Sequence, residues 1–177
     1  MAHVILALLL LMPGSQYDLV RRFEAGVSLF YSASSGSIKR ALDQLLALGE
    51  IEVAEAAPQP RGRIVYRVTP EGEASFRAWM AAPVRGDLET AVLARVHFLG
   101  LLPASERVSV LRGLEARIAE ELAELEGAEQ QLRGSEVAPE LREVFAWQLA
   151  TLDYGLGSTR HALTWLRALI EQAAREA

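Results

Sequence analysis

Hydroxylic and cationic side chains gather on one face of a predicted helix, 34–48, in a spacing suited to contacts with phosphates and bases. Ile38 and the alanine and leucines that follow it at helical spacing form an apolar stripe, which predicts burial of the opposite face. The front face carries small, hydroxylic, amide or cationic side chains, with Asp43 as its lone acid. Ser34 is suited to cap the start and Gly49 to end the helix. Taken alone, the segment is also typical of an ordinary surface helix, so its neighbours must decide.

The charge of the chain is divided unevenly. The 177 residues carry a net charge of −5, with nine Lys/Arg and eight Asp/Glu in residues 1–85, and nine Lys/Arg and fifteen Asp/Glu in residues 86–177. Phosphates meet one face of a protein and not its average charge, so an acidic chain is compatible with DNA binding. The second half is then not the DNA-facing part. The chain has no cysteine, which excludes disulfides and thiolate chemistry and fits a reducing compartment.

The N-terminal segment 2–12 is strongly apolar. No Lys or Arg precedes it, no small-residue cleavage site follows it, and it is shorter than the about 20 residues that span a bilayer. We interpret it as a helix buried in a core. The sequence therefore predicts a soluble, cytoplasmic protein without membrane contact.

The elements before residue 84 are expected in the order helix, helix, helix, two-stranded hairpin, helix. The first three helices are predicted at 4–12, 16–25 and 34–48, the strands at 51–56 and 64–68, and the fourth helix after Thr69 as N-cap. Arg21 and Arg22 are expected to point outward from the second helix. This order is the winged helix-turn-helix plan, in which the third helix enters the major groove and the wing reaches the backbone or minor groove. Residues 1–83 are thus predicted to be a DNA-binding domain.

Three stretches of this half resemble the PadR-like transcriptional regulators: LALLLLMPGSQYDLVRRFE, SGSIKRALDQLLALGEIE and RGRIVYRVTPEGEASFRAWM. The segments 13–19, 36–49 and 66–72 occupy the places of the family's patterns. The chain departs from them at Ser35, Lys39-Arg40 and Glu50-Ile51, where relatives often carry other residues. The resemblance implies a winged helix-turn-helix regulator, and effectors of this family are often flat aromatic compounds. The first two departures lie where bases or phosphates would be met, so we do not transfer the family's operator sequence to this chain.

The second half is predicted to be helical, with one helix over 87–102, a long helix from 104 or 105, a turn at 134–139 and a last helix to the C-terminus. Leucines and isoleucine recur at heptad spacing in both long helices, which indicates coiled-coil-like seams. Gly155 and Gly157 suggest a close helix crossing or a bend, and we favour a crossing at a dimer interface. The stretches FLGLLPASE and TLDYGLGSTRHALTWL resemble the C-terminal domain of longer PadR-like regulators. The predicted fold is thus mainly α, a winged helix-turn-helix followed by a long-helix dimerisation and effector domain, 84–177.

Two groups of candidate binding residues follow. Those expected at DNA are Gln16, Tyr17, Ser34, Ser35, Gly36, Ser37, Lys39, Arg40, Arg61 and Arg63. The aromatic residues that either line an effector pocket or simply pack the dimer core are Phe98, Trp147, Tyr154 and Trp165.

The sequence predicts a homodimeric regulator, a repressor, that binds a palindromic DNA operator and is released by a small aromatic ligand. The three histidines lack metal-ligand spacing, and no catalytic triad or phosphate-binding glycine loop is recognisable, so we expect no enzyme activity, metal or cofactor. Two alternatives remain open: a winged-helix adaptor that binds proteins, and a ligand sensor without direct DNA contact.

Overall fold

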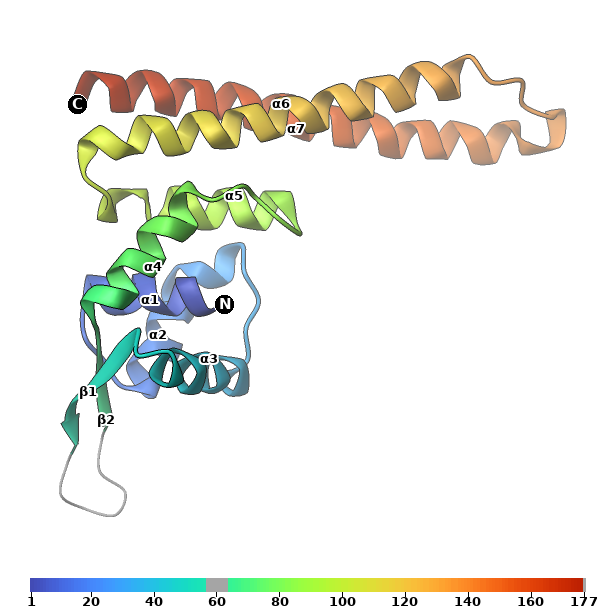
Figure 1. The fold of residues 1–177 in the computed structure, drawn as a ribbon. Helices are drawn as coiled ribbons and strands as arrows, with labels where there is room; N and C mark the ends of the chain where they lie inside the picture. Colours follow the sequence, from blue (N-terminus) through green and yellow to red (C-terminus); the bar gives the residue numbers. More distant parts are fainter. Residues whose placement is uncertain (57–63, 177) are drawn as a thin grey trace. The chain divides into compact units, whose positions relative to one another are not determined.

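The computed structural model describes residues 1–56 and 64–176. The chain folds as two compact units, Met1–Arg107 and Val108–Ala177, and each is described by itself (Figure 1). The boundary predicted between residues 83 and 84 separates a DNA-binding from a dimerising part and stays a prediction. By packing, the helix that follows this boundary belongs to the first unit.

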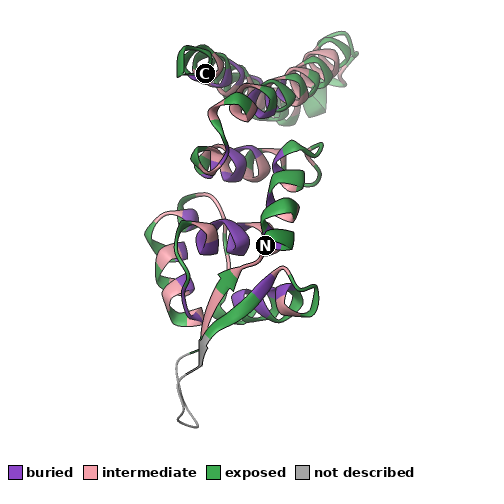
Figure 2. Cartoon of the chain, turned by 60° about the vertical axis from the view of Figure 1, so that its left-hand side comes forward, coloured by how far each residue is buried: buried purple, intermediate pink, exposed green. Residues whose placement is uncertain are grey.

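The first unit is built around its N-terminal helix. All residues from Val4 to Leu9 are buried, because this apolar helix is surrounded on every side (Figure 2). Its elements are α1 (Ala2–Leu11), α2 (Gln16–Ala25), η1 (Val27–Leu29), α3 (Ser35–Ala47), β1 (Ile51–Ala56), β2 (Ile64–Val68), α4 (Pro70–Ala81), α5 (Leu88–His97) and η2 (Leu99–Leu101). Their order confirms the predicted winged helix-turn-helix fold.

The helix starts lie where the sequence predicted them, because each is fixed by a local cap. Ser15 and Ser34 form capping boxes with Asp18 and Ser37, respectively. Thr69 accepts a hydrogen bond from the backbone of the residue three positions ahead, and a proline follows it in the first turn.

The wing is an antiparallel pair with a third point of attachment. β1 and β2 pair in register from Ile51 opposite Val68, with an irregularity between Val53 and Glu55. Tyr66 of β2 also exchanges two backbone hydrogen bonds with Gly14, of 3.0 and 3.1 Å. The base of the wing is thereby tied to the loop between α1 and α2.

The predicted helix over 87–102 is wrong in its second part. Asp87 is the N-cap, but the α-helix ends at His97 and a 3₁₀ turn follows to Leu101. Leu102 is extended, which a residue before proline favours, and its carbonyl oxygen accepts a 3.0 Å hydrogen bond from Nε of Arg107.

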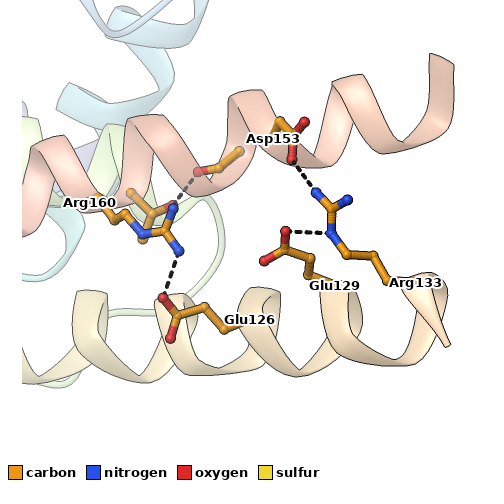
Figure 3. A network of polar contacts seen from close by, with 7 residues as sticks. Glu126, Glu129, Arg133, Asp153 and Arg160 are labelled. Atoms are coloured by element: carbon orange, nitrogen blue, oxygen red, sulfur yellow. Dashed lines mark hydrogen bonds and ion pairs between the residues drawn. The ribbon is translucent and has the colours of Figure 1, made fainter. Parts of the chain in front are cut away.

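The second unit is a pair of antiparallel helices joined through the 3₁₀ turn η3 (Pro139–Leu141). They are α7 (Arg142–Glu176) and α6 (Ala104–Arg133) from Val108 onward, since the first turn of α6 belongs to the first unit. The predicted heptad positions Leu111, Leu156 and Leu166 are buried. Ion pairs connect the two helices: Arg133 of α6 pairs with Asp153 of α7, and Arg160 of α7 pairs with Glu126 of α6 (Figure 3). The glutamates of α6 are therefore partly engaged with α7 and not only solvated.

The glycine pair of α7 divides between two environments. A Cβ atom on Gly155 would lie 4.0 Å from Leu125 of α6, whereas one on Gly157 would meet nothing within 4 Å. Gly155 thus faces the partner helix of the same chain. Within the described part of the chain, no helix is long and apolar enough to span a bilayer.

Candidate nucleic-acid interface

Helix α3, the predicted recognition helix, has a buried back and an exposed front. Ile38, Leu42 and Leu45 are buried against the rest of the first unit. On the opposite face Ser35, Gly36, Lys39 and Arg40 are exposed. The structure therefore brings these predicted contact residues together on one surface.

The first turn of α3 is held by its own serines. Ser34 Oγ accepts from the Ser37 backbone N–H at 3.1 Å, and Ser37 Oγ accepts from the Ser34 N–H at 2.9 Å. The Ser37 hydroxyl also donates to the Ser34 carbonyl oxygen at 2.7 Å. Ser34 and Ser37 consequently order the turn, while Ser35 and Gly36 form its outer surface.

The start of α2 is connected to the start of α3. Gln16 Nε2 lies 3.3 Å from both the carbonyl oxygen and Oγ of Ser35. Tyr17, the next residue, is exposed. Helix α2 is thus connected to the first turn of α3 through one amide side chain, which sequence periodicity could not reveal.

The two cations of α3 differ in their partners. Lys39 Nζ lies 2.7 Å from Asp43 Oδ2, and this hydrogen bond, together with the carboxylate's charge, raises the pKa of Lys39. Arg40 has no ion pair among the described residues. Lys39 is also the sole lysine of the sequence. Of the two cations of α3, Arg40 can therefore contact a phosphate or base without first breaking an ion pair.

In the described part of the wing, one arginine forms an ion pair with a glutamate. Arg67 Nε of β2 lies 2.6 Å from Glu52 Oε1 of β1, and both side chains are exposed. Arg61 and Arg63, the predicted wing contacts, lie outside the described residues.

Arg22 does not point outward as predicted. Its guanidinium donates to the carbonyl oxygens of Leu8, Met12 and Pro13, at the C-terminal end of α1. The carbonyl oxygens of Met12 and Pro13 lie just past α1, and that of Leu8 also accepts from the Met12 N–H, so Arg22 adds donors to the acceptors at this helix end. Arg21 is exposed.

The predicted effector residues fall into both units. Phe98 is buried in the first unit, with its ring edge-on to His97 at 4.7 Å. Trp147 and Tyr154 are exposed on α7, and Trp165 is half-buried there. The second unit by itself does not enclose a pocket with all four side chains, since Phe98 is not part of it.

The sequence and the fold of this chain are similar to those of known proteins. Residues 90–173 match the family described as virulence activator alpha C-term. No curated protein matches the sequence. Bacillus subtilis PadR in complex with operator DNA is similar at 20% identity and a TM-score of 0.44, covering 97% of this chain and 98% of that chain.

Two further solved structures are similar over nearly their whole length. The PadR-like regulator BC1756 of Bacillus cereus has 25% identity and a TM-score of 0.41, with 97% of this chain and 94% of that chain covered. The virulence activator AphA of Vibrio cholerae has 18% identity and a TM-score of 0.40, with 99% of both chains covered. The resemblance to PadR-like regulators is confirmed. The winged helix-turn-helix itself rests on the order and pairing of this chain's own elements.

Proposed function

We propose that this protein is a dimeric, sequence-specific DNA-binding transcriptional regulator, a repressor, with α3 as its recognition helix. The observation that carries the proposal is the exposed front of α3, where Ser35, Gly36 and unpaired Arg40 stand on a helix whose back is fully buried. Small side chains let the helix approach a groove closely, and arginine bonds both guanine edges and phosphates. Gln16 and Tyr17 would lie near phosphates, and Arg61 and Arg63 would hold the wing on the backbone.

The dimer is supported by an uncovered aromatic face on α7. Trp147 and Tyr154 are 72% and 79% exposed, and Leu141 and Val144 near the same end of the helix are also exposed. Large apolar side chains in one exposed patch are typical of an interface. A two-fold dimer through residues 84–177 would present two recognition helices about 34 Å apart to a palindromic operator.

An aromatic effector is supported by one of the similar proteins. Bacillus subtilis PadR has also been solved in complex with p-coumaric acid, at 19% identity to this chain. We propose that a small aromatic compound binds this regulator and releases it from DNA.

The first test compares two arginine variants in a DNA-binding titration. Arg40→Ala should weaken binding to the DNA upstream of the protein's own gene and reduce the salt slope by about one, because one phosphate or base contact is lost. Arg112→Ala removes the same charge from an exposed position of α6 and should leave affinity unchanged. Absence of binding at low salt, or equal affinity of the Arg40→Ala variant and the wild type, would contradict the proposal.

The single lysine allows a second, direct test. An amine-reactive acylating reagent modifies Lys39 and the chain's α-amine, and peptide mass spectrometry measures the rate at each. Bound DNA should slow acylation of Lys39 and leave the α-amine rate as an internal control. Equal Lys39 rates with and without saturating DNA would show that α3 is not the contact helix, even if the protein binds DNA.

A further inference from the structure

The exposed front of α3 has an acid at its centre. Successive residues of an α-helix are about 100° apart around its axis, so Gly36, Asp43 and Ala47 lie within about 40° of one another. All three are exposed, and the fully buried Leu45 lies on the opposite side. Asp43 is the lone acid of the helix. Because its neighbours along this stripe are small, the helix can approach a surface closely enough for a short aspartate side chain to reach it.

This acid is joined to the single lysine of the chain. Lys39 Nζ donates to Asp43 Oδ2 at 2.7 Å, and the two side chains are 60% and 57% exposed. An ion pair in such contact with water adds little to stability. Its order along the helix is also the less favourable one, because the cation lies nearer the N-terminal end and the acid nearer the C-terminal end. Helix stability therefore gives little reason for the pair.

A carboxylate on this face opposes contact with the DNA backbone. Phosphates repel it, and this loss is offset only where the acid accepts a hydrogen bond from a base. In the major groove the available donors are the amino groups N4 of cytosine and N6 of adenine. An acid at the centre of the front thus favours contact with a base edge.

The pair as a whole matches the major-groove edge of one base pair. Guanine O6 and cytosine N4 are hydrogen-bonded to each other, so they lie about 2.9 Å apart. Lys39 Nζ and Asp43 Oδ2 present a donor and an acceptor at nearly the same separation, 2.7 Å. The ammonium has three N–H donors, and guanine offers N7 beside O6. Lys39 can therefore donate to guanine while Asp43 accepts from cytosine, without loss of the ion pair.

An A·T pair matches this arrangement less well. It also sets a donor, adenine N6, beside an acceptor, thymine O4, but the thymine C5-methyl group lies next to that acceptor. Thymine offers the ammonium one acceptor in the major groove, whereas guanine offers two. The chemistry of the ion pair therefore favours G·C.

We propose that Lys39 and Asp43 together recognise one G·C base pair in each half-site of the operator, with Lys39 donating to guanine and Asp43 accepting from cytosine. The inference rests on the proposed function and deepens it, because it names a base pair that α3 selects. Since the ion pair carries no net charge, it adds sequence preference and leaves the salt dependence of binding to other cations.

The test selects bound duplexes from a random DNA library with the full chain. The wild type should select a consensus with one G·C pair in each half-site at which a Lys39→Met/Asp43→Ala double variant shows no preference. The other consensus positions should stay the same. Affinity of the double variant for the wild-type consensus should fall about tenfold, because one specific base-pair contact is lost. The salt slope should not change, because the double replacement removes no net charge.

An ion pair of the same spacing on α4 supplies the matched control. Arg77 Nη2 lies 2.8 Å from Glu73 Oε1, and both side chains are exposed. The Glu73→Ala/Arg77→Met double variant likewise removes no net charge, and it should keep both the consensus and the affinity. If the Lys39→Met/Asp43→Ala variant also keeps the full consensus, the inference is wrong and the proposed function stands.

Substituted base pairs decide the question with the unchanged protein, even if a variant fails to fold. Inosine paired with cytosine keeps O6, N7 and N4 in the major groove and lacks the guanine N2 amino group of the minor groove. Inosine at the selected position should therefore bind as tightly as guanine, whereas A·T should bind about tenfold more weakly. If inosine weakens binding as much as A·T does, or if A·T binds as tightly as G·C, the inference is wrong. A protein that binds no duplex at low salt contradicts the proposed function, and the inference fails with it.

Discussion

Gly72, in the first turn of α4, is the position where the fold tolerates a side chain least. A Cβ atom there would lie 2.0 Å from the Glu50 carbonyl oxygen and 2.8 Å from Cγ1 of Val68, whereas ordinary contacts begin at 3.4 Å. The same turn is held by the Thr69 N–H, which donates to the Glu50 carbonyl at 3.1 Å. The Thr69 hydroxyl donates to the Gly49 carbonyl at 2.7 Å. Gly72→Ala therefore requires the turn to move by about 1.4 Å and to stretch both bonds.

The expected loss of stability follows from these contacts. Overpacking of this severity costs about 3 kcal/mol, and two weakened hydrogen bonds add about 1 kcal/mol each. The higher helix propensity of alanine offsets about 1 kcal/mol of this destabilisation. A net destabilisation of about 4 kcal/mol lowers the Tm of a chain of this size by roughly 8–16 °C.

Thermal and urea unfolding at one fixed protein concentration measure this loss. Gly113→Ala is the matched control, because it adds the same methyl group in α6 where nothing lies within 4 Å. It should stabilise the protein by about 0.5–1 kcal/mol. A Gly72→Ala variant within about 1 kcal/mol of the wild type would refute the close approach between α4 and Glu50.

Three further outcomes are expected. Gly36→Ala has room for its methyl group, 3.8 Å from the nearest atom, so the Tm should hold while DNA affinity falls, and unchanged affinity would remove this face of α3 from the interface. Replacing Trp147 and Tyr154 together by serine should raise the dimer dissociation constant in sedimentation equilibrium, and an unaffected dimer would place the interface elsewhere. Burial lowers the pKa of His3, so the unfolded chain takes up that proton first and stability falls as pH drops through about 6.5. His3→Gln should lose this part of the Tm change between pH 8 and pH 5.5, and an identical change in both proteins would contradict it.

Helix starts were predictable because their causes are local. Ser15, Ser34 and Thr69 each cap a helix by accepting from the backbone N–H three residues ahead, and such spacing is visible in the sequence. The exposed face of α3 followed from periodicity in the same way. The Lys39–Asp43 pair, four residues apart on one helix, is equally local.

The arginines show where sequence reasoning failed. Arg22 was expected at the surface because it is charged. Its partners are backbone carbonyl oxygens, which every residue carries, so the sequence gives no sign of them. Arg95 lies three residues after Val92 and four before Leu99, on the apolar stripe of α5, and that spacing was a usable sign of a buried cation. The burial of Arg95 against α4 depends on two helices meeting in space, which sequence patterns do not give.

The ion pairs of the first unit also limit how it can bind DNA. Lys39, Arg67 and Arg77 each have a carboxylate partner, whereas Arg21 and Arg40 have no ion pair among the described residues. If the two predicted wing arginines also meet phosphates, about four cations per chain would contribute, and a dimer that used all of them would show a salt slope of about −7. A single chain would have half that slope and correspondingly weak binding. We therefore expect that losing the proposed dimerisation through α7 would weaken operator binding as much as losing the contacts of α3, because a single chain would bring only half of these cations to the DNA.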